Sequence, residues 1–285
     1  MLLPMAHFRQ KLTSLRNSPA FQADPAGTLL RLAAWRWRCA VGAGAVVQLS
    51  DGSRLELPAE WRGVAKLLYA FRSHYERELP FLIGRLRPGM VFADVGASYG
   101  VYTVLGARAV GPEGTVLSFE PGRRAFEVLM RNVRLNQLTN VRAFRAALGE
   151  SGRKGHLIHH ADPSRNALCA GRRPASESEE VEVLTLDGLL EQQAVTRVDV
   201  MKVDVEGAEA LVFSGAKRLI ERCRPEILFE INGPACDALG LDRRQAWDLL
   251  EQMGYRFCSV GPDGGLQHLD APRDGNVLAL ARSDP

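Results

Sequence analysis

From residue 90 onward, short apolar runs rich in β-branched residues alternate with longer stretches whose apolar residues recur every three or four positions. The short runs predict buried strands, and the longer stretches predict helices with one buried face. The predicted strands are 90–95, 115–119, 141–147, 197–204, 225–231, 255–259 and 276–281. The predicted helices are 99–110, 121–136, 185–192, 208–222 and 242–254.

Such an alternation of strands and helices is typical of a doubly wound α/β sheet with mostly parallel strands. The last two strands are joined by residues 260–275, which have no helical pattern. Parallel neighbours normally need a long crossover, so this connection predicts a hairpin-like final pair with one antiparallel strand. The expected fold is therefore a Rossmann-like, seven-stranded sheet.

Residues 1–89 carry a different pattern and are predicted to form an N-terminal extension of helices and a β-hairpin. Two runs of alternating apolar residues within 45–57 flank Asp51-Gly52, a dipeptide that favours a tight hairpin turn. The residues that follow have helical spacing up to Pro88-Gly89. The predicted domains are this extension and a ligand-binding domain at 90–285.

Residues 159–180 are polar and rich in Pro, Ser and charge, and they predict an exposed loop for which a lid is one possible use. The loop and the N-terminal extension are expected to build the substrate pocket. Arg172 and Arg173 could hold an anionic substrate, but a solvated loop is the simpler interpretation. His159 and His160 lie in the same polar loop and are expected to be solvated.

The chain of 285 residues is 46% hydrophobic and 24% charged, which is typical of a globular protein with a sizeable core. Its net charge of +3 is unevenly distributed. Residues 1–90 hold 13 Lys and Arg against 6 Asp and Glu, whereas the remainder holds 23 against 27. The front part could favour an acidic partner or a membrane surface, although a solvated basic face is the simpler interpretation.

Two further features bear on localisation. The five cysteines are widely spaced, odd in number and without a CxxC pair, which argues against a disulfide scaffold and a structural zinc site. The N-terminal residues lack the order of a signal peptide, and no run of 18 apolar residues exists. Residues 28–44 come nearest to a membrane-seeking segment, but Arg31, Arg36 and Arg38 interrupt them and a helix packed on its domain is expected. A cytoplasmic protein without a membrane span is predicted.

The first strand of the second domain ends in "VFADVGASYG", where an acid, Asp94, precedes Gly96, Ala97, Ser98 and Gly100. Ligands of open α/β sheets bind at the carboxyl ends of the strands. The glycines would allow a sharp turn and a close approach of a ligand to the backbone. The start of the next helix would offer free N–H groups. These five residues are therefore the first candidates for cofactor binding.

Two classes of nucleotide cofactor use such a turn. The dinucleotide fingerprint G-x-G-x-x-G lacks its third glycine here, whereas an acid two residues before the first glycine suits S-adenosylmethionine (SAM). The second strand ends in Glu120-Pro121, and a carboxylate there can accept hydrogen bonds from both ribose hydroxyls. Both cofactor classes use such an acid, so Glu120 does not choose between them. Its alternative role is that of an acid at a helix N-terminus.

Five motifs occur in the order "DVGASYGVYT", "SFEPGRRAFEVLMRNVRLNQL", "VLTLDGLL", "VDVMKVDVEGAEALVFSGA" and "PEILFEIN". Together they resemble the FkbM family of SAM-dependent methyltransferases over roughly residues 75–235. The most specific piece is "KVDVEGAE" with "TLD" upstream. The resemblance implies a class I methyltransferase fold, SAM as cofactor and O-methylation of sugars, polyketides or related natural products.

The chain departs from the family at two positions. The family usually has Asn where Ser98 stands, and a serine can still form a hydrogen bond. It often has His where Asn232 stands, so an imidazole that could act as a base is absent here.

Methyl transfer to oxygen needs an aligned acceptor and a group that takes the hydroxyl proton. Asp204 is expected to end the fourth strand, Glu206 follows in the turn, and Glu230 ends the fifth strand beside Asn232. These three acids are the catalytic candidates, with Asp204 nearest the chemistry. Such a set of oxygens could also hold Mg²⁺, as in catechol-type O-methyltransferases, but an acid cluster alone does not specify a metal and none is predicted.

Other residues near these motifs have simpler interpretations. Glu209 stands at a helix start, where an acid interacts well with the helix dipole. Lys202 alternates with Asp204 and is expected to pair with an acid. Asp187 of "TLD" is expected to cap or support a turn, although it could reach the site.

The leading hypothesis is a SAM-dependent O-methyltransferase acting on a small-molecule or glycan hydroxyl. The alternatives are an NAD(P)-linked Rossmann oxidoreductase, a Mg-dependent catechol-type enzyme and a SAM-like module without catalysis. The missing third glycine argues against the oxidoreductase, and the retained acids argue against the inactive module. Nucleic acid is not an expected partner, because the second domain is net acidic. The oligomeric state is left open.

Overall fold

The structure is a computed structural model that describes residues 21–22, 24–72, 75–160, 166–169, 178–261 and 263–282. The chain divides into two compact units, Met1–Glu76 and Arg77–Pro285. Among the described residues, no helix has both the length and the apolar character needed to cross a bilayer.

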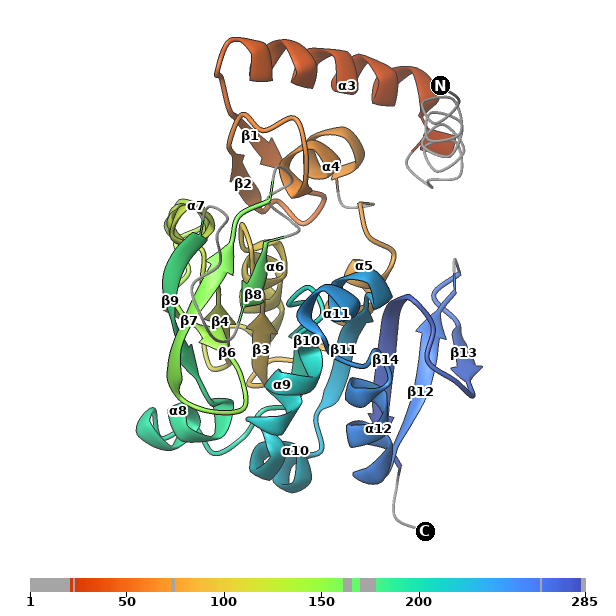
Figure 1. Cartoon of the computed structure of the whole chain (residues 1–285). Coiled ribbons are helices and arrows are strands. Elements are labelled where there is room, and N and C mark those ends of the chain that lie inside the picture. The colour runs from red at the N-terminus through yellow and green to blue at the C-terminus, as the bar shows by residue number, and fades with distance from the viewer. Residues whose placement is uncertain are drawn as a thin grey trace, which may run out of the picture. The chain divides into compact units, whose positions relative to one another are not determined.

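The first unit contains α3 (Pro25–Ala40), the strands β1 (Ala45–Gln48) and β2 (Arg54–Leu57), and α4 (Val64–Phe71) (Figure 1). The hairpin is confirmed, since β1 and β2 pair antiparallel around the predicted turn. The helix α3 packs against α4 through Trp35, which is fully buried and stacks on Tyr69 at 4.8 Å. The indole N–H of Trp35 donates to the carbonyl of Glu60 at 2.8 Å.

The second unit is built on a sheet in the order β13-β12-β14-β11-β10-β3-β4-β5. The predicted α/β class with a mostly parallel sheet is confirmed, and β14 runs antiparallel to its neighbours β11 and β12. An eighth strand, β13, was not predicted; it forms a hairpin with β12. The strands are β3 (Val91–Val95), β4 (Thr115–Phe119), β5 (Val141–Phe144), β10 (Val200–Val203), β11 (Glu226–Ile231), β12 (Tyr255–Val260), β13 (Leu266–Leu269) and β14 (Gly275–Ala281).

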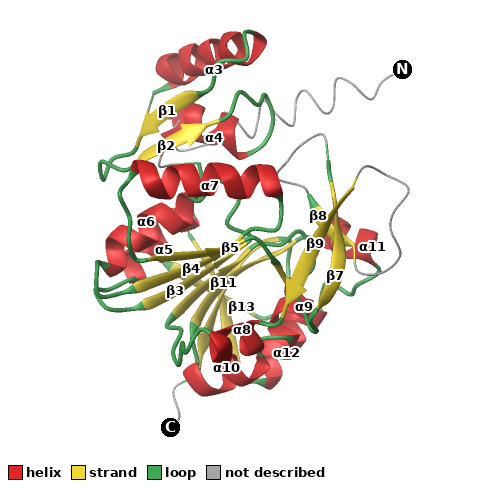
Figure 2. Ribbon diagram, turned by 90° about the vertical axis from the view of Figure 1, so that its left-hand side faces the viewer, coloured by secondary structure: helices red, strands yellow, loops and turns green. Residues whose placement is uncertain are grey.

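Helices cover both faces of this sheet, with α5, α6 and α7 on one side and α8, α10 and α12 on the other (Figure 2). The helices are α5 (Glu78–Arg85), α6 (Val101–Val110), α7 (Arg123–Leu135), α8 (Leu186–Gln192), α9 (Glu209–Ser214), α10 (Lys217–Cys223), α11 (Gly233–Leu239) and α12 (Gln245–Gln252). The helical spacing of apolar residues in the sequence predicts most of these helices, but it does not predict α11.

The predicted helix 208–222 is two helices, α9 and α10, separated near Gly215. A Cβ at Gly215 would overlap with the carbonyl of Gly149, so the backbone of a distant segment passes close to the break. Asp187 accepts hydrogen bonds from Arg218 N at 3.0 Å and Leu219 N at 2.9 Å. It therefore caps the start of α10, which confirms its predicted supporting role.

A second, smaller sheet in the order β6-β9-β7-β8 was not predicted. Its strands are β6 (Ala147–Leu148), β7 (Arg153–Ile158), β8 (Ala167–Cys169) and β9 (Ser178–Leu184). The prediction of one continuous loop at 159–180 is therefore wrong at β8 and at the start of β9. Arg172, Arg173 and most of the proposed lid lie outside the described residues.

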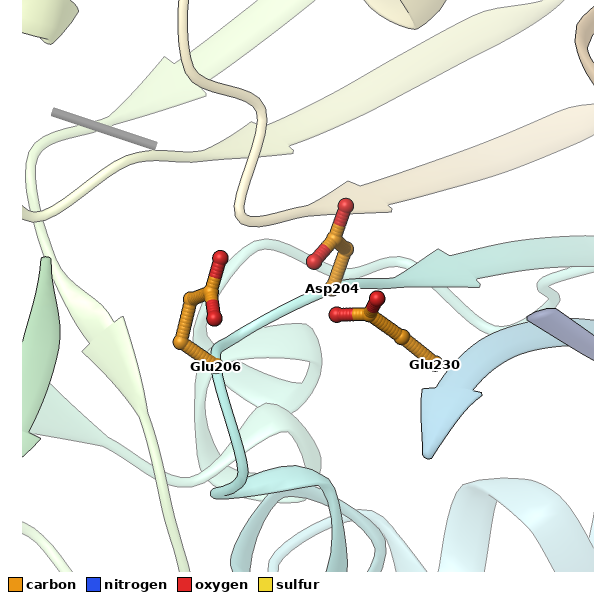
Figure 3. Close-up of side chains that lie close together, drawn as sticks. All are labelled: Asp204, Glu206 and Glu230. Atoms are coloured by element: carbon orange, nitrogen blue, oxygen red, sulfur yellow. The ribbon is translucent and has the colours of Figure 1, made fainter. Parts of the chain in front are cut away.

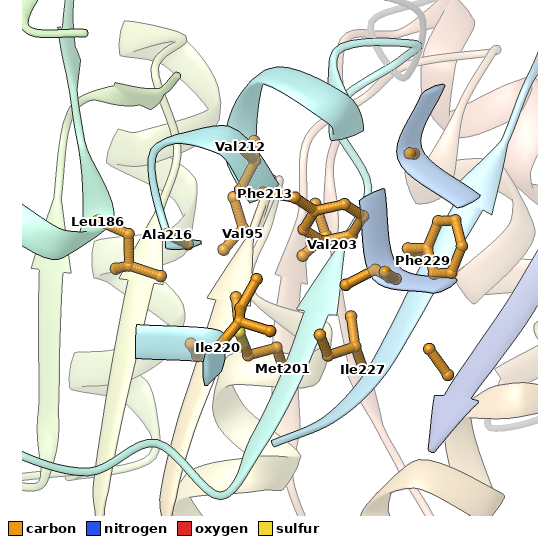
Figure 4. Close-up of a cluster of buried hydrophobic side chains, with 14 of the residues drawn as sticks. Val95, Leu186, Met201, Val203, Val212, Phe213, Ala216, Ile220, Ile227 and Phe229 are labelled. Carbon is orange, nitrogen blue, oxygen red and sulfur yellow. The ribbon is translucent and has the colours of Figure 1, made fainter. Parts of the chain in front are cut away.

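The main core lies between the sheet and the helices α9, α10 and α12 (Figure 4). Phe213 of α9 meets Phe229 of β11 edge to face at 5.4 Å, and Trp247 of α12 stacks on Phe257 of β12 at 3.7 Å. Apolar side chains from β3, β10 and β11 fill the space below. This packing fixes the ends of those three strands, on which the candidate site is built.

Candidate functional site

Hydrogen bonds between backbone groups tie the loops that follow β3 and β10 to the ends of the neighbouring strands β4 and β3. The N–H groups of Gly96 and Ala97 both donate to the carbonyl of Phe119 at 2.9 Å. The N–H of Asp204 donates to the carbonyl of Val95 at 3.0 Å. The carboxyl ends of these adjacent parallel strands thus form one rigid edge, where α/β folds place their ligands.

Gly96 has a left-handed backbone conformation with a φ of +80°. A Cβ at this position would overlap with the carbonyl oxygen of Asp204. The glycine is therefore required because two loops of the protein pass each other here. The sharp turn expected at this glycine is confirmed by its φ, and the close passage of the Asp204 carbonyl is a further reason for it that the sequence did not reveal.

The remaining residues of the first loop lie directly before α6. Ala97 is buried, Ser98 adopts a positive φ of 49°, and Gly100 is the residue that precedes the helix. A positive φ is less costly for Asn than for Ser, which accounts for the Asn expected at this position from the family resemblance.

Asp94 is the most deeply buried acid of the site, with 1% of its surface exposed. Its Oδ2 accepts a hydrogen bond from Thr103 Oγ1 at 2.6 Å, and Thr103 Oγ1 lies 2.8 Å from Ser118 Oγ. Its Oδ1 is buried without a hydrogen-bond partner among the described residues. Burial raises the pKa of Asp94, and the nearby charge of Lys202 opposes that rise. A buried acceptor without a donor is costly, so this oxygen suits a ligand that brings one.

Glu120 connects the ends of β3 and β4. Its Oε2 accepts from Ser98 N and its Oε1 from Gly122 N, both at 2.8 Å. Burial raises its pKa to about 7, although these two backbone hydrogen bonds act against the rise. Each carboxylate oxygen keeps a second lone pair that can accept a hydroxyl, so Glu120 can hold the loops and bind a ribose at once. Pro121 lies half-buried between Glu120 and Gly122.

The predicted catalytic acids Asp204, Glu206 and Glu230 are brought together by the structure. One carboxylate oxygen from each lies within 4.8 Å of the others, and all three residues are partly exposed. Figure 3 shows them gathered from the end of β10, the turn after it and β11. Such a group can orient a hydroxyl, accept its proton or hold a metal ion.

Asn232 holds one member of this group in place. Its Nδ2 donates to Glu206 Oε2 at 3.2 Å, while its Oδ1 accepts from Ala235 N at 3.2 Å and caps α11. Glu206 itself has a positive φ of 53°, a conformation uncommon for a residue with a side chain of this size. The start of α11 therefore positions a strained turn residue at the site.

Lys202 is buried and pairs with Asp204, with 2.9 Å between its Nζ and Asp204 Oδ2. Its ammonium also lies 4.7 Å from the centre of the Tyr102 ring. The predicted pairing with an acid is thus confirmed. Because Lys202 supplies a positive charge to Asp204, it competes with a metal ion for the same carboxylate.

Glu209 is buried behind the turn, where its Oε1 accepts from Val205 N at 3.1 Å and Gly207 N at 3.3 Å. Burial raises its pKa to about 7, against the effect of these backbone hydrogen bonds. These contacts agree with the structural role expected for it, since they shape the turn that carries Glu206.

Sequence reasoning missed Thr103 and Ser118, which complete the surroundings of Asp94. Ser118 carried a signal, because it is a polar residue inside an apolar strand and lies beside Asp94 in the sheet register. Thr103 lies on the first turn of α6, and its contact depends on where that helix packs. The sequence also contains a signal that Asn232 caps a helix, since Asn followed by Gly-Pro favours a helix start.

Known proteins match this chain over the part that carries the site. A family model described as the methyltransferase FkbM domain matches residues 94–257. "Methyltransferase 1" of Beauveria bassiana is 28% identical over 189 residues, which cover 60% of this chain and 74% of the relative. "Methyltransferase sdnD" of Sordaria araneosa is 28% identical over 203 residues, with coverages of 61% and 76%.

Solved structures of low sequence identity are also similar. A methyltransferase FkbM from Methylobacillus flagellatus has a TM-score of 0.44 and 17% identity. The match covers 92% of this chain but 60% of that longer one. A cofactor-bound protein of MTB, Rv0187, has a TM-score of 0.46 and 16% identity, with coverages of 94% and 99%.

Proposed function

Because this chain belongs to the FkbM family of methyltransferases, we propose that it transfers a methyl group from SAM to a hydroxyl of a small molecule or glycan. Sugars, polyketides and related natural products are the acceptor classes that fit this proposal. The observation that carries it is the convergence of Asp204, Glu206 and Glu230 beside the loop of Asp94.

The residues assigned to SAM are Asp94, Gly96, Ala97, Ser98, Gly100, Glu120 and Pro121. The buried oxygen of Asp94 that lacks a donor suits the cationic methionine end of the cofactor. The spare lone pairs of Glu120 suit the ribose hydroxyls. When bound, SAM supplies a methyl group that is already activated by a positive sulfur.

Asp204 is proposed as the residue that accepts the hydroxyl proton or aligns the hydroxyl. It follows β10 and is partly exposed, so an acceptor can reach it. Lys202 holds the carboxylate of Asp204 from its buried side. Glu206 and Glu230 are proposed to orient the acceptor, and Asn232 fixes Glu206. A positioned base of this kind typically contributes about 10²–10⁴-fold to the rate.

A Mg-dependent reaction is the second candidate, because the three carboxylates are close enough to share one ion. The ammonium of Lys202 at 2.9 Å from Asp204 Oδ2 argues against it. The NAD(P)-linked alternative loses its support, because the family to which the chain belongs transfers methyl groups.

Calorimetry with SAM, S-adenosylhomocysteine and NADH tests the cofactor. We expect the first two to bind and NADH to give no signal. A methylation assay with hydroxyl-bearing sugars and polyketides, and with catechols as a separate class, then tests the acceptor. Binding of NADH without binding of SAM would refute the cofactor assignment, and methylation of amines alone would refute O-methylation.

A further inference from the structure

The first unit exposes more apolar surface than its size explains. Among the described residues, the exposed large hydrophobic side chains are Leu29, Leu30, Trp37, Val41, Val46, Trp61 and Leu266. All but Leu266 belong to the first unit, which holds less than a third of the chain. Contiguous exposed apolar surface of this kind marks a site of interaction.

Four of these side chains, Leu29, Leu30, Trp37 and Val41, lie on the helix α3 or at its C-cap. On α3 the buried side is formed by Thr28 and Trp35, and at 100° per residue the positions opposite to them are 26, 30, 33 and 37, which the C-cap residue 41 follows on the same side. All five are exposed and apolar, with Leu30 at 71% and Trp37 at 66% exposure. We call this stripe, with its exposed apolar neighbours Leu29, Ala34 and Ala40, the outer face of α3. The helix thus has apolar surface on the side that should be polar.

Positive charge borders this face. The only charged residues of α3 are Arg31, Arg36 and Arg38, and its first turn has no acid. Arg36 is exposed and lies over the ring of Trp61 at 5.5 Å. Lys66 approaches the same ring at 5.7 Å. Tryptophan and arginine beside an apolar face are the combination that places a helix at the boundary between lipid headgroups and acyl chains.

We infer that the outer face of α3 docks on an anionic lipid surface. The helix would lie in the plane of the interface, with Leu30 and Trp37 inserted among the lipids and the exposed Arg36 directed to the headgroups, whereas Arg38 is held within the first unit by a hydrogen bond to the carbonyl of Gly44. The inference concerns the first unit alone and does not depend on the methyl-transfer proposal.

The charge argues against a second copy of the chain as the occupant. Symmetric pairing would bring the same face of two helices together and place their exposed Arg36 side chains near one another, and the nearest acid, the N-cap Asp24, already pairs with Arg31. An anionic surface meets the same arginines with opposite charge.

Co-sedimentation of the full chain with lipid vesicles tests the inference. We expect sedimentation with vesicles that contain phosphatidylglycerol and much less with vesicles of phosphatidylcholine alone. Added salt should weaken the binding, because it screens the arginines. Equal binding to both kinds of vesicle, or to neither, would overturn the inference.

Matched variants assign the binding to the outer face. The double variant Leu30→Ser/Trp37→Ser should lower the partition coefficient at least about tenfold, because two large apolar groups no longer leave water. Leu266→Ser removes an exposed leucine of the second unit, 44% exposed, and should change nothing. Arg36→Gln should lower binding about fivefold, whereas Arg256→Gln, at the one exposed position of β12, should not.

Two controls keep the result interpretable. Calorimetry with SAM should give the same affinity for the Leu30→Ser/Trp37→Ser variant as for the unchanged chain, which shows an intact second unit. Sedimentation velocity without vesicles should show the same species for both proteins. A dimer that the double variant dissociates, combined with no binding to vesicles, would show that a second copy covers the face. Binding that the α3 variants leave unchanged would equally overturn the inference.

Discussion

The site contains two groups of carboxylates that differ in burial and in the partners that hold them. Asp94 and Glu120, at the ends of β3 and β4, are buried, and three of their four oxygens accept hydrogen bonds from fixed groups of the protein. Asp204, Glu206 and Glu230, at the ends of β10 and β11, are partly exposed and face one another. The first group joins loops, whereas the second is open to an incoming molecule.

This difference suggests a division of work along the edge of the sheet. Buried carboxylates with short hydrogen bonds are suited to bind a cofactor in one geometry, because little reorganisation remains when it arrives. Partly exposed carboxylates with a cation on one side are suited to receive a substrate and its proton. Changes in the second group should therefore affect turnover, and changes in the first should affect cofactor affinity.

The largest effect is expected from Asp204→Asn. The variant keeps the shape of the side chain but loses its basicity, so kcat should fall by about 10²–10⁴-fold. It should be measured at saturating SAM, together with the SAM dissociation constant. Asp237→Asn, an exposed acid of α11, is the matched control and should retain activity.

The opposite result for Asp204→Asn would contradict the division between cofactor-binding and catalytic carboxylates. If Asp204 instead holds the amino group of SAM, affinity should fall steeply while kcat at saturation stays nearly unchanged. That result would move Asp204 from the open group to the cofactor-binding group.

The next effect is expected from Glu120→Ala. Two hydrogen bonds to the ribose are lost, each worth about 1.5–3 kcal/mol, so the SAM dissociation constant should rise about 10²-fold or more. Calorimetry measures the affinity, and circular dichroism checks the fold. Glu127→Ala on the exposed side of α7 is the control. An unchanged affinity with a normal spectrum would show that Glu120 only joins the loops.

A smaller effect is expected on the pH dependence of stability. Glu209 has a folded-state pKa of about 7, above its ordinary value of 4.5. Between these values the folded protein keeps a proton that the unfolded chain has lost. The stability that Glu209 contributes is therefore fully present below pH 4.5 and is lost as the pH rises through 7.

The variant Glu209→Gln removes this titration while keeping an oxygen that can accept from Val205 N and Gly207 N. It should be more stable than the unchanged protein by roughly 1–3 kcal/mol at pH 8, with little gain at pH 4.5. Denaturant unfolding at the two pH values measures this. If the stability of Glu209→Gln falls between pH 4.5 and pH 8 as much as that of the unchanged protein, Glu209 is ionised in the folded protein. The pKa of Glu120 is also raised to about 7, so Glu120 should still cause part of the loss of stability with rising pH in the Glu209→Gln variant.

Much of this arrangement follows from local sequence. Three strands of the main sheet, β3, β4 and β10, are apolar runs with Asp94, Glu120 and Asp204 at or next to their carboxyl ends, so the order of strands and helices was enough to place these acids at one edge. Because strand ends are set by the change from apolar to polar residues, the sequence contains this information directly.

The remainder depends on contacts between distant segments. The break near Gly215 is set by the carbonyl of Gly149, and the need for Gly96 is set by the carbonyl of Asp204. The strand β13 is almost entirely exposed, so its residues show no apolar alternation that could reveal it. No window of local sequence contains these features, so the break near Gly215 and the strand β13 were not predicted, and the part of the Asp204 carbonyl in the need for Gly96 was not foreseen.

The smallest effect is expected from removal of metal ions. The three open carboxylates could share an ion, but the ammonium of Lys202 already compensates the charge of Asp204 at 2.9 Å, and Asn232 holds Glu206 through a hydrogen bond. A divalent ion would have to displace the lysine from one carboxylate and compete with the amide for another. We therefore expect EDTA to leave kcat unchanged in an assay with saturating SAM.

The variant Lys202→Met removes the cation that competes with a metal ion and completes this test. It should lower activity if the lysine positions Asp204, and added Mg²⁺ should not restore the activity. Complete loss of activity with EDTA and recovery with Mg²⁺ in the unchanged protein would instead establish the catechol-type mechanism, and the open carboxylates would then be metal ligands rather than acceptors of a proton.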